Sequence, residues 1–182
     1  APSDFMTVIG GNGAGKSTML NAIAGIFKVD TGSIIINGTD VTKLPEYKRA
    51  CHIGRVFQDT RMGTASDMTI EENMAMALRR GKRRGLKKGI TKAERNLFRE
   101  RLEILDLGLE NRMTAKTGLL SGGQRQALTL LMATMTKPEL LLLDEHTAAL
   151  DPKTAKKVLE LTNQIITEDK FLGGGCNSSP LF

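Results

Sequence analysis

The feature that most constrains the fold is the run GGNGAGKST at positions 10–18, which fits the pattern G-x-x-x-x-G-K-[ST]. Glycines in such a run let successive backbone N–H groups point at phosphate oxygens, where a Cβ atom would obstruct them. The pattern requires a strand before it and a helix after it. Residues 5–9 are β-prone, and apolar residues at helical spacing follow Lys16. The sequence therefore predicts a strand over 5–9, a phosphate-binding loop over 10–18 and a helix over 16–27.

We expect this phosphate loop (residues 10–18) to contact a nucleotide with Mg²⁺. Lys16 is expected to reach the β- and γ-phosphates, and the Ser17 hydroxyl to ligate the metal. The helix that follows presents its positive end to the same anion. A chance match to the pattern is on the order of 1% for a chain of this length, so a turn without a ligand is the weaker interpretation. The predicted nucleotide contacts are Gly10, Asn12, Gly13, Ala14, Gly15, Lys16, Ser17 and Thr18.

A second element is the run of four leucines at 140–143, followed by Asp144 and Glu145. A short, wholly apolar run is typical of a strand buried in a parallel sheet. Taken alone, acids after a strand are ordinary exposed residues. Paired with the phosphate loop, they predict that Asp144 ligates the metal and that Glu145 is the general base or polarises the attacking water.

The middle of the chain is predicted to be helical. The pairs Thr69 with Glu72 and Thr91 with Glu94 both fit the capping box, and they predict helices over 70–80 and 92–106. A third helix is expected from Ser121 to about Met135. Two further strands are predicted over 33–37 and 53–57.

The segment 79–89, between the first two of these helices, holds four Arg, three Lys and no acidic residue. The formal net charge is +6, so the remainder of the chain is close to neutral. The segment is either a solvated loop or a stretch attracted to the anionic inner leaflet, worth about 1 kcal/mol per residue near the surface. Nucleic-acid binding is the weaker interpretation, because no aromatic residues are interleaved and aromatics form only 4% of the chain.

Composition excludes several classes of protein. Hydrophobic residues form 40% and charged residues 25% of the 182 residues, as in soluble globular domains, which argues against disorder. No apolar run approaches the 18 or so residues of a membrane span, and no signal peptide is visible. The two cysteines, Cys51 and Cys176, show no disulfide or metal spacing, which favours a reducing interior.

The run LSGGQ at 120–124 completes a set of motifs in a fixed order: GGNGAGKST, Gln58 after a strand, LSGGQ, LLLLDE at 140–145 and Ala149-Leu150-Asp151. With this set the chain resembles the ATP-binding-cassette (ABC) ATPases over roughly residues 5–168. The resemblance implies an α/β fold, in which a P-loop NTPase core with a mainly parallel sheet flanked by helices carries an inserted α-helical subdomain. The implied core is 1–62 with 136–170, the helical subdomain is 63–135, and 171–182 is a non-native or disordered tail.

The resemblance also implies a division of roles. Ser121, Gly122, Gly123 and Gln124 would contact the γ-phosphate held by the phosphate loop of a second subunit, so that two ATP molecules are buried in a head-to-tail dimer. Gln58 would contact Mg²⁺ or the attacking water, which makes Lys16, Gln58 and Glu145 the catalytic set and Ser17, Gln58 and Asp144 the metal set. Asp151 would communicate across the dimer, although a helix N-cap explains it as well.

The implied function is that of an ATP-hydrolysing subunit of an ABC transporter. It would lie in the cytoplasm at the inner face of the membrane, drive a separate membrane subunit, and pair with a second copy or a homologous ATPase subunit; no nucleic acid is expected as a partner. An ABC ATPase acting on DNA is a weaker alternative, because the interval from Gln58 to Ser121 is too short for long coiled coils and has no sustained heptads.

A third alternative is a nucleotide-binding fragment with impaired catalysis, because the sequence departs from the family's pattern. It lacks an upstream aromatic to stack on adenine, a contact worth about 1–3 kcal/mol. The two histidines, His52 and His146, do not lie where the family has its switch histidine. His146 follows Glu145, where the family commonly has proline, and we interpret it as a turn residue. On these grounds we expect a chain truncated at both ends.

Overall fold

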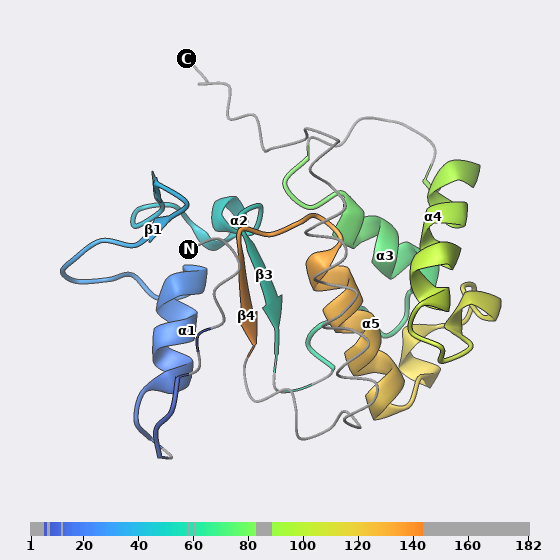
Figure 1. Ribbon diagram of the computed structural model, residues 1–182, viewed down its shortest axis with the longest axis horizontal. Helices are drawn as coiled ribbons and strands as arrows, with labels where there is room; N and C mark the ends of the chain where they lie inside the picture. Colours follow the sequence, from blue (N-terminus) through green and yellow to red (C-terminus); the bar gives the residue numbers. More distant parts are fainter. Residues whose placement is uncertain are drawn as a thin grey trace.

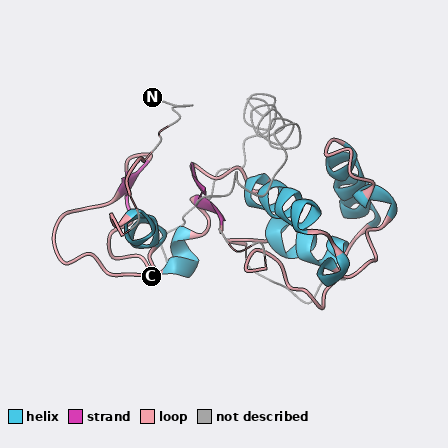
Figure 2. Cartoon of the chain, turned by 90° about the horizontal axis from the view of Figure 1, so that it is seen from below, coloured by secondary structure: helices cyan, strands magenta, loops and turns pink. Residues whose placement is uncertain are grey.

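The computed structural model describes residues 6, 8–11, 13–57, 59, 61–82 and 89–143, and the structural statements below concern these residues. Two strands lie in the middle, with α1 on one side and three other helices, α3, α4 and α5, on the other (Figures 1 and 2). In chain order the elements are α1 (Lys16–Ala24), β1 (Ile35–Ile36), β2 (Thr39–Asp40), α2 (Glu46–Arg49), β3 (Ile53–Val56), α3 (Ile70–Leu78), α4 (Lys92–Glu103), the 3₁₀ helices η1 (Leu109–Asn111) and η2 (Thr117–Leu119), α5 (Gly122–Thr134) and β4 (Leu140–Leu143).

The central pair, β3 and β4, is parallel, with Ile53 opposite Leu140 and Val56 opposite Leu143. The helices α3, α4 and α5 lie between these two strands in the chain, so the connection crosses over, as parallel pairing requires. At Gly54 the sheet meets the end of α5, where an added Cβ would lie 2.6 Å from the carbonyl oxygen of Ala133. Both predicted strands are therefore present, and only glycine fits at their closest contact with the helical part.

The helix after the phosphate loop ends at Ala24, three residues earlier than predicted. Gly25 adopts a left-handed conformation with φ of 90°, and its N–H donates to the carbonyl oxygens of Asn21 and Ala22. A glycine in this conformation is a common helix stop, because other residues pay a steric penalty there. The prediction of a helix was thus correct, and its last turn was overestimated.

The strand predicted over 33–37 is only two residues long, because the chain reverses at Asn37-Gly38. These residues have φ of 46° and 78°, and they join β1 to β2 in an antiparallel hairpin with Ile35 opposite Asp40. Asn-Gly is the residue pair that such a tight hairpin turn favours. The sequence thus contained a signal for β2 that the strand prediction missed.

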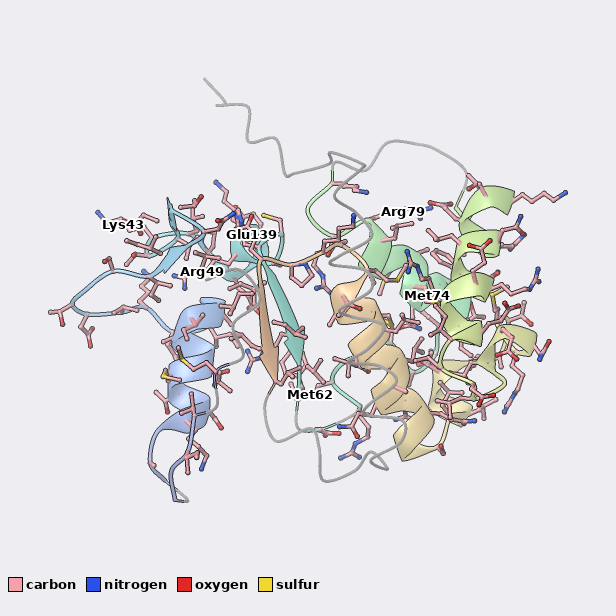
Figure 3. The ribbon with its side chains drawn as sticks, viewed as in Figure 1. Lys43, Arg49, Met62, Met74, Arg79 and Glu139 are labelled. Atoms are coloured by element: carbon pink, nitrogen blue, oxygen red, sulfur yellow. The ribbon has the colours of Figure 1, made fainter. Side chains whose placement is uncertain are left out.

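Arg49 joins this hairpin region to α1. Its side chain is buried, with 2% of the residue exposed, and its guanidinium donates to four backbone carbonyls. The acceptors are Ala22 and Ile23 at 2.8 Å, Thr42 at 2.8 Å and Leu44 at 2.9 Å. Figure 3 shows Arg49 between α1 and the segment that carries Lys43. Arg49 therefore connects the end of α1 to residues 42–44 with a buried guanidinium that donates to four backbone carbonyls.

The helices α3, α4 and α5 share one apolar core. Fully buried residues from all three helices meet in it, among them Met74, Phe98 and Leu131. Both predicted capping boxes form: the Thr69 and Thr91 hydroxyls accept from the N–H groups three residues on at 3.2 Å, and the Glu72 and Glu94 carboxylates accept the return bonds at 2.7 Å. The helix starts were thus predicted correctly, whereas α3 and α4 end two and three residues earlier than expected.

One predicted strand is wrong for the residues that the structure describes. Met6, Val8 and Ile9 belong to no strand and are exposed, by 85%, 44% and 92%. A β-prone sequence forms a strand only where a neighbouring strand takes its backbone hydrogen bonds. Among the described residues no backbone hydrogen bond joins these three to another strand.

No helix in the described ranges is both long and apolar enough to cross a membrane.

Candidate functional site

The phosphate loop has a backbone that only glycine adopts easily. Gly13 and Gly15 have φ of 80° and 85°, in the left-handed region. The N–H of Ala14 donates to the carbonyl of Gly11 at 3.2 Å, which closes the turn. A Cβ on Gly10 would lie 3.0 Å from that of Ala14, so the loop is also tight across its base. These constraints explain the glycine pattern on conformational grounds.

Lys16 folds back over this loop. Its ammonium donates to the carbonyl oxygens of Gly10 and Gly11, the latter at 3.1 Å. The cation is therefore held above the turn, next to the N-terminus of α1. A lysine in this position can exchange a carbonyl contact for a phosphate oxygen without moving its backbone.

The first turn of α1 is open to a ligand. The N-cap Gly15 makes no side-chain cap, and the first intrahelical bond is from the N–H of Met19 to the carbonyl of Gly15 at 2.9 Å. The N–H groups of the first turn have no intrahelical acceptor. Ser17 and Thr18 are exposed on the same turn. Backbone donors, a dipole, a lysine and two hydroxyls thus meet at one helix end, which is the chemistry of a phosphate site with room for a hard cation.

The LSGGQ run forms the start of α5. Ser121 is the N-cap, and its hydroxyl accepts from the N–H of Gln124 at 3.2 Å. The side-chain oxygen of Gln124 accepts from the N–H of Ser121 at 3.2 Å. This third capping box was not predicted, although S-x-x-Q is its sequence signal. It fixes the start of a second helix whose dipole favours an anion.

Gly122 and Gly123 have free space around them. An added Cβ would meet nothing within 4 Å at either position, and neither residue has a positive φ. Glycine in a helix costs up to about 1 kcal/mol relative to alanine. The internal packing of the described chain therefore does not require glycine at these two positions, in contrast to Gly54.

The strands β3 and β4 end at the same edge, because they are parallel with Val56 opposite Leu143. In the sequence, Gln58 comes two residues after β3, and Asp144 and Glu145 come directly after β4. Gln58, Asp144 and Glu145 lie outside the described residues, as do Asn12, His146, Asp151 and the predicted tail 171–182. Their predicted roles remain predictions.

The phosphate loop and the start of α5 lie at the same end of the molecule, on opposite sides of the central strands. In Figure 1 the N-terminal ends of α1 and α5 and the carboxyl ends of β3 and β4 all point downward, with α1 at the left and α5 at the right. Figure 2 shows the same separation of α1 and α5 across the strands. The structure therefore brings the loop and the strand edge to one end and keeps the LSGGQ run apart from the loop.

Sequence reasoning missed two buried polar side chains in the helical part, Asn73 and Thr117. Both are 0% exposed. Asn73 lies in α3 among apolar residues and was read only as part of a helical stretch. An amide on the buried face of an apolar helix is the signal that points to it, because a buried polar group needs partners.

A glycine-rich loop that leads into an open helix N-terminus, beside the carboxyl edge of a parallel strand pair, defines a P-loop nucleotide-binding protein with an α/β fold. The family model described as ABC transporter matches residues 1–148. The chain belongs to the ABC transporter family.

Curated relatives agree with this assignment. The chain is 48% identical over 165 residues to a tyrosine transport ATP-binding protein of Clostridioides difficile (strain R20291), covering 91% of this chain and 65% of that protein. It is 37% identical over 166 residues to the methionine import ATP-binding protein MetN of Rhizobium johnstonii, covering 89% of this chain and 43% of the relative. The chain thus spans less than two thirds of the length of these relatives.

Solved structures show the same fold. A dimeric ATP-binding cassette in a post-hydrolysis state, bound to ADP and Pi, matches with a TM-score of 0.70 and 32% identity. The match covers 87% of this chain and 68% of that one. The P-loop NTPase fold expected from the sequence is confirmed.

Proposed function

We propose that this chain is the ATP-binding and ATP-hydrolysing subunit of an ABC transporter. It binds MgATP between two subunits arranged head to tail and drives transport through a separate membrane subunit. The second subunit is another copy of this chain or a homologous ATPase subunit. In this proposal residues 1–62 and 136–170 form the ATPase core and residues 63–135 the helical subdomain.

The observation that carries the proposal is the placement of two anion-directed helix starts at one end of the molecule, on opposite sides of the sheet. The phosphate loop, on which the triphosphate would bind, lies across the central strands from the same chain's α5 (Figure 1). A second chain turned by 180° brings its own α5 over that triphosphate, and the same rotation completes the second site. The free space at Gly122 and Gly123 supports this arrangement, because an approaching phosphate fits where a side chain would intrude.

Each predicted site residue has a role in this dimer. The loop residues Gly10 to Thr18 hold the phosphates with backbone N–H groups, and Lys16 neutralises the β- and γ-phosphates. Ser17 and Asp144 hold Mg²⁺, which supplies charge neutralisation when bound, and Gln58 orients the attacking water or ligates the metal. Glu145 accepts a proton from that water. From the partner, Ser121, Gly122, Gly123 and Gln124 donate to the γ-phosphate, and Asp151 contacts the partner near the same site.

The location that follows is the cytoplasm, at the inner face of the membrane next to the transporter's membrane subunit. The names of three relatives mention different solutes: one tyrosine, one methionine, and the third spermidine and putrescine. Different solutes are expected if the membrane subunit selects the solute and this chain supplies the energy. We propose that no residue of this chain contacts the solute.

The basic segment 79–89 supports a peripheral contact with the membrane. Arg79 is paired with Glu94 at 2.9 Å, so the attraction to an anionic leaflet, about 1 kcal/mol per charge near the surface, would come from the other basic residues of the segment. Sedimentation with vesicles that contain anionic lipid should retain the chain, and neutral vesicles should not. Equal binding to both would contradict the membrane contact.

The test of the main proposal is MgATP binding and steady-state hydrolysis by the chain and its Lys16→Met variant. We expect wild-type turnover that rises more than linearly with protein concentration, because the site needs two chains. Lys16→Met should lose turnover at least about 100-fold, since the loop loses its cation. Matched Lys43→Met, at an exposed lysine of the hairpin region, should retain it. Turnover by Lys16→Met at the wild-type rate would refute the proposal.

A further inference from the structure

Two segments that flank the predicted nucleotide contacts are joined inside the helical part. Residues 61–68 (the post-Gln58 segment) lie between β3 and α3, and residues 115–120 (the pre-Ser121 segment) lead into α5. Backbone hydrogen bonds connect them directly: Gly118 N–H donates to Ser66 O at 2.9 Å, and Thr117 N–H to Met68 O at 3.0 Å. The two segments are thus paired, although about 50 residues separate them in sequence.

Asn73, on α3, holds the post-Gln58 segment by hydrogen bonds to the backbone of Ala65. Its Oδ1 accepts from the N–H of Ala65 at 2.8 Å, and its Nδ2 donates to the carbonyl of the same residue at 3.1 Å. Nδ2 also donates to the carbonyl of Thr69 at 2.9 Å. One amide side chain therefore pairs with both polar groups of a single residue, as a neighbouring strand would. Because Asn73 is fully buried, water does not compete for these bonds.

Thr117, in the pre-Ser121 segment, also binds Ala65. Its hydroxyl donates to the carbonyl of Ala65 at 2.8 Å and lies 3.5 Å from Nδ2 of Asn73. Thr117 is likewise fully buried. Ala65 is thus held by α3 and by the pre-Ser121 segment at once. The three residues Ala65, Asn73 and Thr117 form one junction, which we call the Asn73 junction.

The chain between the Asn73 junction and the capping box of α5 is short and closely packed. A Cβ on Gly118 would lie 3.0 Å from the carbonyl oxygen of Ser66, so the two segments touch backbone to backbone. Arg125, in the second turn of α5, donates to the carbonyls of Gly118 at 3.1 Å and Leu120 at 3.3 Å. A short and tightly packed segment therefore connects the Asn73 junction to Ser121 at the start of α5.

We propose that Asn73 and Thr117 are positioning residues for the Ser121 capping box. They hold the start of α5 in a fixed place relative to the post-Gln58 segment, residues 61–68. This proposal rests on the proposed function, in which Ser121 contacts the partner's nucleotide. A purely local role in stabilising the loop would leave the capping box unchanged when the junction is cut.

Amide hydrogen exchange of the nucleotide-free chain tests the proposal directly. The variants are Asn73→Leu and Thr117→Val, which remove the polar groups at similar shape. We expect exchange to accelerate roughly tenfold at Ala65 and also at Gln124, whose N–H donates to the Ser121 hydroxyl. Faster exchange at Ala65 with wild-type exchange at Gln124 would overturn the proposal.

Two control variants separate positioning from general destabilisation. Thr134→Val makes the same change at a threonine of α5 that is 2% exposed and donates to Leu131 O at 2.8 Å within its own helix. It should leave exchange at Gln124 unchanged. Thr117→Ser keeps the hydroxyl and should restore wild-type exchange even if Thr117→Val folds poorly. A rise at Gln124 in Thr134→Val equal to that in Thr117→Val would also overturn the proposal.

A second readout links the junction to function. Sedimentation measures the self-association that ATP drives. It should weaken at least fivefold in Asn73→Leu and Thr117→Val, while the affinity of each chain's own phosphate loop for ATP stays within about twofold of wild type. Ser121→Asp should weaken self-association as well. If Ser121→Asp leaves it unchanged, the proposed function fails and the exchange experiment still decides the positioning role. If only the junction variants leave it unchanged, the positioning proposal alone is wrong.

Discussion

Ser121 and Gln124 exchange two hydrogen bonds of 3.2 Å, each side chain accepting the backbone N–H of the other residue. This reciprocal cap fixes the start of α5 while leaving the serine hydroxyl and the following glycines exposed or only partly buried. Ser121 and Gln124 can therefore cap the helix and, at the same time, make the predicted contact with the nucleotide of the second subunit. Substitutions can separate the two roles.

Gln124→Glu should preserve stability and impair nucleotide-driven assembly. Glutamate keeps the capping box and suits the helix dipole, so the free energy of unfolding should stay within about 0.5 kcal/mol of wild type. Its carboxylate repels the partner's γ-phosphate, so ATP-driven self-association should weaken. Urea unfolding and sedimentation check the two parts. Unchanged self-association would contradict the assignment of Gln124 to the nucleotide.

Gly123→Ala should make the chain more stable and less active. The added Cβ meets nothing within 4 Å, and alanine is favoured over glycine in a helix by up to about 1 kcal/mol. The same methyl group occupies the space proposed for the partner's phosphate. Gly54→Ala is the contrasting variant, because its Cβ would lie 2.6 Å from Ala133 O and should destabilise the fold by about 1–3 kcal/mol. Thermal unfolding together with turnover checks this pair.

Arg49→Met should destabilise the chain by about 3 kcal/mol. It removes a buried guanidinium and its hydrogen bonds to four backbone carbonyls, of which, among the described residues, only Ala22 O keeps another donor, the Gly25 N–H. Lys48→Met changes the exposed neighbouring lysine and should shift the free energy of unfolding by no more than about 0.5 kcal/mol. Chemical denaturation of both variants provides the comparison. Equal, small effects would show that the Arg49 contacts do not stabilise α1.

Glu94 should make the stability of the helical part depend on pH in the acidic range. The pKa of Glu94 lies below its usual value of 4.5, mainly because its carboxylate accepts a hydrogen bond from the Thr91 N–H. The Arg79 guanidinium, 2.9 Å away, lowers it further. A lowered pKa in the folded state stabilises the fold above pH 4.5, and this contribution is lost as pH falls through the folded pKa.

Glu94→Gln isolates this effect, because glutamine keeps the cap and has no charge. We expect its free energy of unfolding to fall less than that of wild type between pH 6 and pH 3, and the two curves to approach each other at the acidic end. Urea titrations at several pH values measure this. Parallel curves across the range would contradict the role of Glu94.

The parts of the fold that sequence predicted well depend on local signals. Thr69 and Thr91 mark helix starts through their own capping boxes. The glycine pattern of the phosphate loop fixed its backbone, as the positive φ values of Gly13 and Gly15 show. These elements need few distant partners, which is why the sequence was sufficient.

The parts that sequence did not predict depend on tertiary contacts. The strand expected near Val8 needs a pairing partner, and the Asn73 junction exists only because α3 and two remote segments converge on Ala65. Arg49 reads as one more cation on a short polar stretch, yet it is buried against four carbonyls. Side-chain spacing along the chain carries no record of such contacts.

The most direct test of the head-to-tail site is complementation between two inactive variants. Lys16→Met removes the cation of the loop, and Ser121→Asp keeps a good N-cap while repelling the phosphate. Each variant alone should be inactive. In a mixed dimer the loop of the Ser121→Asp chain meets the intact Ser121 of the Lys16→Met chain, so an equal mixture should recover up to about a quarter of wild-type ATP turnover. Turnover that stays at the level of the separate variants would contradict a site shared between two chains.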